Sequence, residues 1–352
     1  MNRKPKTKPK KITEGAYGCI YKPAITETGK IEEQYINKIQ IAKPVTESEP
    51  RLGSIIKTIP NYRRYFAPSE QVSSLVVAAI DKKEMKKCEV VSKEKNKKVV
   101  VSKIPYVGKS TLGEQIESIR ESLPSRTLST MKSFHNHLNK AINLLTDDKI
   151  GIVHNDIKQN NIVYSESLQC PVLIDFGLSY CVHELETVED INNAFQVYYE
   201  KYPPSHIEVT CIGRIVSDPK WHTKQVDIED IKETIHTIFT ENPVYEIIEK
   251  YIGKEEMKKE EKKRIKKMEQ IFSQTKNGKK FVDELLENWD TWDLYSINVM
   301  MLKQCEAGIP IPSTPSPPVT EGGKKTKDPY MKELMEYRMQ LIKDILKGDT
   351  SP

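Results

Sequence analysis

The sequence predicts an α+β protein in which a small β-rich region precedes a larger, mostly helical region. Between residues 11 and 107, short β-prone runs are separated by glycine turns and lysine-rich stretches, which is typical of a small sheet. From Leu128 onward, apolar residues recur at helical spacing. With 352 residues, the chain is long enough to bury a core in each region.

The composition indicates a globular protein of the cell interior. Hydrophobic residues make up 37% of the chain and charged residues 30%, and the net charge of +5 does not by itself indicate nucleic-acid binding. No apolar run approaches the ~20 residues that span a bilayer, and the N-terminus lacks the apolar core of a signal peptide. The six cysteines are scattered without a Cys-x-x-Cys pair, which suits a reducing compartment. We therefore expect an intracellular, cytoplasmic protein without membrane contact.

Both ends of the chain have the composition of segments outside a core. Residues 1–11 carry six basic side chains and two prolines, so we expect a disordered basic tail. This tail either keeps the chain in solution or contacts an acidic protein or nucleic acid. Residues 304–328 are proline-rich and predict an extended linker, and residues 329–352 predict a last amphipathic helix and a tail.

The β-rich region is predicted to begin with a glycine hairpin. Residues 11–25 have the pattern of strand, glycine-containing turn and strand, and a third strand is expected at residues 34–39. A helix should follow, with Thr46 and Glu49 spaced as a capping box. The remaining expected elements are strands at 72–80 and 99–107 and a lysine-rich loop at 82–98.

The most informative stretch is residues 154–161, which reads His-Asn-Asp-Ile-Lys-Gln-Asn-Asn and precedes an Asp-Phe-Gly turn. Asp156 lies in a loop between short strands, where its carboxylate can take the proton of a substrate hydroxyl. Lys158 can neutralise charge on a phosphoryl group during transfer. Asn161 and Asp175 offer the hard oxygen ligands that Mg²⁺ prefers. Together these residues predict phosphoryl transfer from ATP.

A nucleotide site is predicted in the β-rich region. Gly15 and Gly18 let backbone N–H groups approach phosphates, and Ile20 would lie over the adenine ring. Lys38 on the third strand is the cation expected to hold the α- and β-phosphates. Lys43 is its competitor, disfavoured because the proline that follows would end a strand there.

Glu49 is the candidate partner that would orient Lys38 through an ion pair. Two alternatives stay open at this point. Glu49 could serve only to cap its helix, or Glu47 could take the ion-pair role.

With these motifs, the chain resembles a eukaryotic-type protein kinase over most of residues 11–303. Residues 15–21 resemble the glycine-rich loop, and Lys38 stands at the lysine of the third strand. Residues 104–108 resemble the hinge of the family, so Tyr106 and Val107 would bind adenine through the backbone. Further resembling segments are the catalytic loop at 154–161, the magnesium-binding turn at 175–177, the end of the activation segment at 202–205 and the start of the central helix of the large lobe at 293–297.

The resemblance implies a bilobal kinase-like fold with ATP and Mg²⁺ as cofactors, and Mn²⁺ as the alternative metal. Its small lobe, with one helix, would span residues 12–104. The larger, mostly helical lobe would span residues 105–303 and carry a charged helical insertion at 206–288 after the activation segment. Lys158 is typical of the serine/threonine branch, so the expected substrate is a protein with Ser or Thr hydroxyls.

Several departures from the family pattern are informative. Asn155 replaces an arginine that pairs with a phosphate on the activation loop, so we expect activity without loop phosphorylation. Ser205 replaces the glutamate that anchors the activation segment, so the anchoring must differ. Gly53 stands where the family has a bulky apolar residue, four positions after the helix glutamate. With the insertion and the short C-terminus, these departures resemble divergent kinases of large DNA viruses, which would place the protein in host cytoplasm or the virion.

Two other functions compete with an active protein kinase. One is a pseudokinase or scaffold that uses the insertion at 206–288 as a binding module. The other is a small-molecule kinase on the same fold, against which Lys158 argues.

Overall fold

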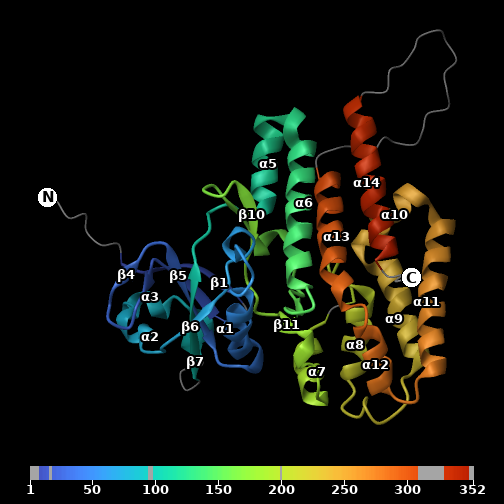
Figure 1. Cartoon of the computed structure of the whole chain (residues 1–352), viewed down its shortest axis with the longest axis horizontal. Helices are drawn as coiled ribbons and strands as arrows, with labels where there is room; N and C mark the ends of the chain where they lie inside the picture. The colour runs from blue at the N-terminus through green and yellow to red at the C-terminus, as the bar shows by residue number, and fades with distance from the viewer. Residues whose placement is uncertain (1–7, 16–17, 94–97, 199, 308–328, 349–352) are drawn as a thin grey trace, which may run out of the picture. The chain divides into compact units, whose positions relative to one another are not determined.

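The computed structural model describes residues 8–15, 18–93, 98–198, 200–307 and 329–348 (Figure 1). These residues form two compact units, of which the first contains the described parts of 1–112, 143–156 and 160–184. The second contains the described parts of 113–142, 157–159 and 185–352. The first unit holds an antiparallel sheet and the second is helical, so the predicted α+β composition, with the sheet in the N-terminal region, is confirmed.

The core of the first unit is a five-stranded antiparallel sheet with the strand order β1-β2-β5-β7-β6. The predicted hairpin and third strand are present, although β1 begins inside the segment predicted to be a basic tail. The strands are β1 (Lys10–Gly15), β2 (Gly18–Lys22), β5 (Tyr35–Ile41), β6 (Glu70–Val72) and β7 (Val99–Pro105). Residues 8 and 9 of that tail belong to no helix or strand. Residues 1–7 of the tail and residues 308–328 of the predicted linker lie outside the described residues.

The two faces of this sheet carry different side chains, because successive residues of a strand point to opposite faces. Ile20 lies opposite Lys38 in the register of β2 and β5, so both side chains are on one face. Cys19 lies opposite Ile39, and these two side chains are on the other face. Helix α1 (Pro44–Ile56) contributes the acidic partner of Lys38, so it packs on the first face.

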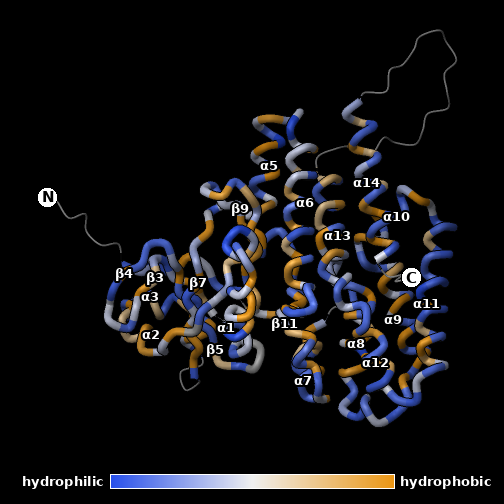
Figure 2. The backbone as a smooth tube through the Cα atoms, viewed as in Figure 1, coloured by the Kyte–Doolittle hydropathy of each residue, from blue (hydrophilic) through white to orange (hydrophobic). Residues whose placement is uncertain are grey.

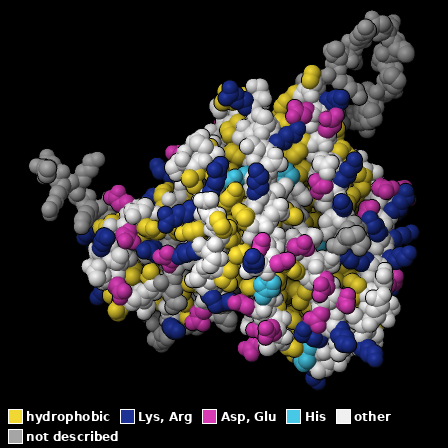
Figure 3. Space-filling view, viewed as in Figure 1, with side chains coloured by type: hydrophobic (Ala, Val, Ile, Leu, Met, Phe, Trp, Pro, Cys, Tyr) yellow, Lys and Arg dark blue, Asp and Glu magenta, His cyan; other side chains and the backbone are white. Residues whose placement is uncertain are grey.

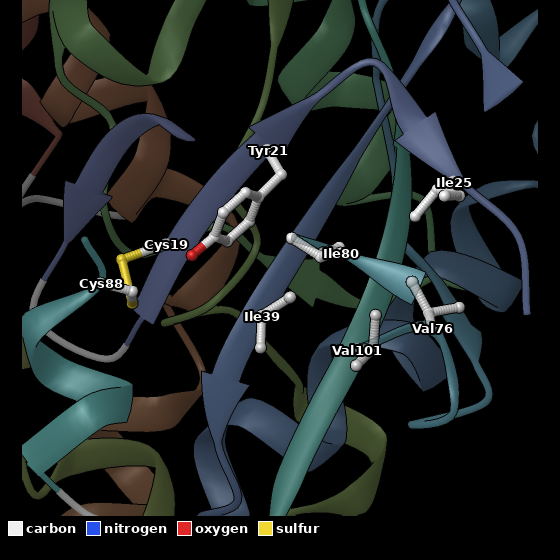
Figure 4. Close-up of a cluster of buried hydrophobic side chains, with 8 residues drawn as sticks. All are labelled: Cys19, Tyr21, Ile25, Ile39, Val76, Ile80, Cys88 and Val101. Atoms are coloured by element: carbon white, nitrogen blue, oxygen red, sulfur yellow. A yellow bond between two sulfur atoms is a disulfide. The ribbon is translucent and has the colours of Figure 1, made fainter. Parts of the chain in front are cut away.

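Three short helices cover the second face, where Tyr21, Ile39 and Val101 form a buried cluster with Val76 and Ile80 (Figure 4). They are α2 (Val76–Ala79), α3 (Lys82–Lys86) and α4 (Glu89–Lys93). The strand expected at 72–80 is therefore wrong beyond Val72, and the loop expected at 82–98 is wrong over residues 82–93, since residues 94–97 lie outside the described part. A side-chain oxygen of Asp81 accepts the backbone N–H of Lys83 at 2.7 Å, which is a helix N-cap that the lysine-rich composition concealed.

A disulfide joins Cys19 in β2 to Cys88 between α3 and α4 (Figure 4). The expectation of cysteines kept reduced is therefore wrong for this pair, while Cys170, Cys181, Cys211 and Cys305 form no disulfide and are buried. The two bonded residues are 69 positions apart and are brought together by the packing of the short helices on the sheet. Spacing along the chain carries no signal for such a pair.

Helix α1 begins earlier than the capping box of Thr46 and Glu49 predicted. Its N-cap is Lys43, and Thr46 occupies the third helical position, where its hydroxyl accepts the backbone N–H of Lys43 at 2.9 Å. Pro44 begins the helix, because proline at the first helical position lacks only an N–H that would be unpaired there. Glu49 consequently lies inside the helix, where it has no capping role.

Short pairs of strands complete the first unit. The β9–β10 hairpin and the β8–β11 pair bring residues 154–161 and 175–177 together, as described below. The elements are β3 (Ala24–Ile25), β4 (Ile31–Glu32), η1 (Tyr62–Arg64), β8 (Ile152–Val153), β9 (Ile162–Ser165), β10 (Cys170–Leu173), β11 (Tyr180–Cys181) and η4 (Val182–Glu184).

The second unit is built from helices around the buried helix α13 (Trp292–Glu306), against which α14 (Pro329–Lys347) packs. The guanidinium of Arg338 in α14 is buried and donates to the carbonyl of Cys305 at 2.5 Å. The other elements of the second unit are α5 (Leu112–Ser122), η2 (Pro124–Arg126), α6 (Thr127–Leu145), α7 (Val188–Phe195), α8 (Ile207–Val216), α9 (Ile228–Glu241), α10 (Pro243–Ile252), α11 (Lys254–Gln274), α12 (Gly278–Leu286) and η5 (Trp289–Thr291). The short helix η3 (Gln159–Asn161) has its last two residues in the first unit.

Residues 206–288 contain the helices α8 to α12, of which the charged α11 is mostly hydrophilic along its length (Figure 2). Its buried side chains are Met257, Arg264 and Met268, so the helix has a narrow core face. On the face drawn in Figure 3, lysine and arginine side chains are interspersed with aspartate and glutamate.

None of the described helices combines the length and the low charge needed to cross a bilayer.

Candidate active site

Lys38 is at the centre of a group of charged side chains in the first unit. Its Nζ lies 2.9 Å from Oε2 of Glu49 and 2.6 Å from Oδ1 of Asp175. The three residues come from β5, α1 and the turn after β10, so segments far apart in the sequence converge on one ammonium. The side chain of Glu49 is 1% exposed, whereas that of Asp175 is 45% exposed, which leaves the aspartate within reach of a ligand.

Burial and the neighbouring charges shift the pKa values of all three side chains. Burial disfavours the charged ammonium of Lys38, but the two carboxylates outweigh it and raise its pKa. Burial is the largest influence on Glu49 and raises its pKa despite the attraction of Lys38. Burial works in the same direction at Asp175, but there the ammonium of Lys38 prevails and the pKa is lowered. Lys38 and Asp175 are therefore charged at neutral pH, as binding of phosphate and metal requires.

The structure resolves the alternatives for the ion pair. Glu47 lies on the exposed side of α1, where it pairs with Lys98 at 3.5 Å. Lys43 is the exposed N-cap of the same helix and is not in the sheet. Lys38 and Glu49 are therefore the residues that meet.

Gly53 allows α1 to lie this close to the start of β6. A Cβ at position 53 would collide with the backbone carbonyl of Ser69. A bulky apolar side chain is present nearby in the chain, because Phe66 is buried with its ring centroid 6.2 Å from that of Phe176. Phe66 was missed by the sequence analysis, and only its apolar character in a polar stretch could have indicated it.

Residues 154–161 and 175–177 are held together by the side chain of His154. Its Nε2 lies 3.1 Å from the carbonyl oxygen of Ile174, and its ring centroid lies 4.8 Å from that of Phe176. The hydroxyl of Ser179 donates to the carbonyl of His154 at 3.0 Å. His154 and Phe176 therefore pack against each other and hold the two loops in register.

Two residues of these loops adopt left-handed backbone conformations, Asn155 with φ 61° and Asp175 with φ 63°. Asparagine and aspartate tolerate this region better than most other residues, and such conformations concentrate at functional sites. The conformation at position 155 gives a local reason for asparagine there. The conformation at 175 turns the chain directly after Ile174, next to the loop that contains Asp156.

Asp156 and Asn161 are hydrogen-bonded to each other. The Nδ2 of Asn161 donates to the Oδ2 of Asp156 at 2.7 Å and to its backbone carbonyl at 2.9 Å. Asp156 is 9% exposed and Asn161 6%, so this bond fixes both side chains. The carboxylate that would accept a substrate proton is thus held in one orientation.

The donor set fits a hard divalent cation. The backbone carbonyl of Asn161 accepts the N–H of Ile174 at 3.0 Å, which brings Asn161 beside the residue that precedes Asp175. Because Nδ2 of Asn161 is the atom bonded to Asp156, its Oδ1 is the atom that could bind a metal. One amide oxygen and one half-exposed carboxylate match the few protein ligands that Mg²⁺ or Mn²⁺ takes.

The two glycines of the hairpin have different environments. At Gly18 a Cβ would collide with the carbonyl of Ile39 in β5, so glycine is required there for the sheet to close. At Gly15 a Cβ would meet no atom within 4 Å, so the fold does not require glycine at that position. Close approach of a ligand to the backbone remains a reason for Gly15, whereas the turn residues 16 and 17 lie outside the described part.

The segment expected to be the hinge follows β7. The backbone N–H of Tyr106 donates to the carbonyl of Gln34 at 2.9 Å, so this N–H is already used within the fold. Of the groups expected to bind adenine, the carbonyl of Tyr106 and the backbone of Val107 remain candidates.

Lys158 is partly buried and belongs to the stretch 157–159, which is part of the second unit.

In the second unit, a buried glutamate with several partners lies three residues after Ser205. Glu208 is 2% exposed, and its carboxylate lies 2.9 Å from Nζ of Lys267 and accepts the indole N–H of Trp292 at 2.9 Å. Its Oε1 also accepts from Asn288 at 3.3 Å. The sequence analysis missed both Glu208 and Lys267, which lie inside the segment predicted to be an insertion.

No protein-family model matches the chain, and no curated protein matches it. Among solved structures, the chain is similar to the kinase PK-1 of the Cydia pomonella granulovirus, with 21% sequence identity and a TM-score of 0.31. The match covers 49% of this chain and 51% of that kinase, so it spans about half of each.

Proposed function

We propose that this chain is a protein kinase that transfers the γ-phosphoryl group of ATP to serine or threonine hydroxyls of a protein substrate. The observation that carries the proposal is Lys38, whose ammonium contacts both a buried glutamate and a half-exposed aspartate. A lysine placed in this way is suited to hold the phosphates of a nucleotide near an aspartate that binds its metal.

Each residue of the site has a distinct role in this proposal. Glu49 orients Lys38, which neutralises the α- and β-phosphates, and Gly15 admits the phosphates to the backbone of the hairpin. Asp156 accepts the proton of the substrate hydroxyl as the oxygen attacks phosphorus. Lys158 offsets the charge on the phosphoryl group in transfer.

Asn161 and Asp175 are the residues that would hold Mg²⁺ or Mn²⁺. The metal, when bound, neutralises negative charge on the phosphate oxygens. The remaining work belongs to the protein side chains, which must hold the nucleotide and the hydroxyl in line and keep Asp156 oriented. The hydrogen bond from Asn161 to Asp156 connects a residue that would hold the metal with the proposed base.

The choice of substrate and the regulation rest on single residues. Lys158 supports a Ser or Thr hydroxyl on a protein as the acceptor. Asn155 supports activity without phosphorylation of the activation segment, because an amide cannot form the ion pair with phosphate that an arginine forms.

The proposal is tested by incubating the purified chain with γ-labelled ATP, Mg²⁺ and basic or acidic generic protein substrates. Label transfer should disappear in Asp156→Asn and Asp175→Ala. The exposed Asp148 provides the matched control, so Asp148→Asn should transfer label at the wild-type rate.

The competing functions give different results in the same assay. A pseudokinase or scaffold would show thermal stabilisation by nucleotide without label transfer. A small-molecule kinase would consume ATP in the presence of a metabolite but not of a protein. Equal labelling by the wild type and the Asp156→Asn variant would contradict the proposal itself.

A further inference from the structure

The segment that contains α3 and α4, residues 81–93, is fastened to the glycine hairpin, and we call it the strap. The backbone N–H of Lys11 donates to the carboxylate of Glu84 at 3.3 Å, and the side-chain Nζ of Lys11 donates to the carbonyl of Lys87 at 2.5 Å. In the opposite direction, the backbone N–H of Val90 donates to Oε1 of Glu14 at 2.9 Å. Both helices of the strap therefore contact β1.

The strap depends on this attachment for its own structure. Helices α3 and α4 have five residues each and contain no buried residue. Isolated helices shorter than about 12–15 residues are marginal in water. Cys88 between the two helices is completely buried, and its disulfide to Cys19 is the covalent link to the sheet.

The hairpin in turn gains support from the strap. Strand β1 is at the edge of the sheet, where it pairs with β2 alone and is largely exposed. Cys19 directly follows Gly18, so the disulfide holds β2 at its second residue, close to the hairpin turn. The side chain of Cys19 is on the face opposite to that of Ile20 and Lys38, so the bond leaves the proposed nucleotide face clear.

We propose that the Cys19–Cys88 disulfide positions the glycine hairpin for nucleotide, so that the disulfide form binds ATP more tightly than the dithiol form. The inference rests on the proposed function, which supplies the nucleotide. A hairpin already held in its binding position loses less conformational freedom when the phosphates bind. Cys19 and Cys88 are positioning residues in this proposal and do not touch the nucleotide.

The redox step is a two-electron exchange. A dithiol reductant such as dithiothreitol is oxidised to its own disulfide, while the bond between Cys19 and Cys88 breaks and each sulfur takes a proton. Both cysteines are completely buried, so attack requires the strap to open first. Reduction of the folded protein should therefore be slow.

The first measurement is a thiol count on the denatured chain without reductant. The chain has six cysteines, so the disulfide form should show four thiols and the reduced form six. ATP affinity in excess Mg²⁺ is then measured by titration calorimetry for both forms and for the double variant Cys19→Ala with Cys88→Ala. A zinc-selective chelator in all samples keeps Glu14 and the two thiolates from holding a metal in place of the disulfide.

We expect the dissociation constant for ATP to rise about tenfold on reduction and in the double variant, because the hairpin is no longer pre-organised. The double variant should not respond to dithiothreitol. Cys211→Ala removes a buried cysteine of α8 that is outside the disulfide and should behave as the wild type, including its response to reductant. Amide hydrogen exchange of β2 without nucleotide should become faster in the dithiol form.

Equal affinities in all forms, with unchanged far-UV circular dichroism and unchanged exchange in β2, would overturn this inference alone. Six thiols in the folded protein prepared under air would overturn it as well. If no form binds ATP, the proposed function fails, and the inference fails with it. If the reduced wild type loses its circular dichroism signal, the comparison of the double variant with Cys211→Ala decides the question.

Discussion

Replacement of Lys38 by methionine removes the ammonium that contacts the carboxylates of both Glu49 and Asp175. Breaking a buried ion pair by removing one partner costs about 3–5 kcal/mol, because the other charge is left buried and unpaired. Glu49 is 1% exposed and receives this cost, whereas Asp175 is 45% exposed and is screened by water. Glu49 can reduce the cost by binding a proton, since burial already raises its pKa.

We therefore expect Lys38→Met to lower the free energy of unfolding by about 3 kcal/mol at pH 8. The raised pKa of Glu49 means that the folded variant binds more protons than the unfolded chain above pH 5. The loss of stability should then become smaller as the pH falls, by up to about 1.4 kcal/mol for each pH unit. Adding Glu49→Gln to Lys38→Met removes the unpaired charge and should recover about 2 kcal/mol at pH 8.

The assay is urea denaturation followed by far-UV circular dichroism, with amide hydrogen exchange of α1 as a readout local to the site. The single variants and the double variant form a double-mutant cycle, which isolates the coupling between Lys38 and Glu49. If the double variant is no more stable than Lys38→Met, or if the two effects simply add, the reasoning about a buried and mutually dependent pair is refuted.

Three further predictions concern the hairpin, a buried histidine and the anchored glutamate. Gly18→Ala should destabilise the fold by about 1–3 kcal/mol because its Cβ collides with β5, whereas Gly15→Ala should keep the wild-type stability and weaken ATP binding, as thermal unfolding and calorimetry would show. Burial lowers the pKa of His135, so the folded state binds fewer protons than the unfolded chain. The free energy of unfolding should therefore fall as the pH drops below about 6.5, which urea denaturation between pH 7.5 and 5.5 would show. Lys267→Met should lower stability by about 2–3 kcal/mol in the same assay, because the buried Glu208 keeps only its neutral hydrogen-bond donors.

Each of these predictions has a control and a contradicting result. Equal stability of the two glycine variants would show that the close approach at Gly18 is not required. His135→Asn should lack the acid-dependent loss, and a wild-type slope in that variant would assign the effect to other groups. Lys266 is an exposed neighbour of Lys267, and an equal effect of Lys266→Met would contradict a specific role for the pair with Glu208.

The parts of the fold that could be predicted from the sequence are those specified by local signals. The glycine hairpin and the strand that contains Lys38 follow from β-prone runs on either side of a turn, and both are present. The helix with Glu49 was expected, but its start was misplaced, because Thr46 and Glu49 were interpreted as a capping box and Pro44 as the end of a strand, whereas Pro44 occupies the first helical position. Local sequence leaves both interpretations of such a proline open.

The missed features depend on contacts between distant segments. The helices of the strap are too short to carry a clear apolar periodicity, and their N-cap Asp81 lies in a run dominated by lysine. The pairing of Cys19 with Cys88 follows only from the packing of that strap on the sheet. Phe66 likewise gains its significance from the ring of Phe176, more than 100 positions away in the chain.

The most direct test of the proposed site is the initial rate of label transfer from ATP to protein in Lys38→Met and Lys43→Met, measured side by side at saturating Mg-ATP. Both variants lose one lysine of the same region, but only Lys38 contacts Glu49 and Asp175. We predict that Lys38→Met transfers label at least about 100-fold more slowly than the wild type, as expected for loss of a phosphate-binding cation, and that Lys43→Met is unchanged. Wild-type transfer by Lys38→Met, or an equal loss in both variants, would contradict the proposed site.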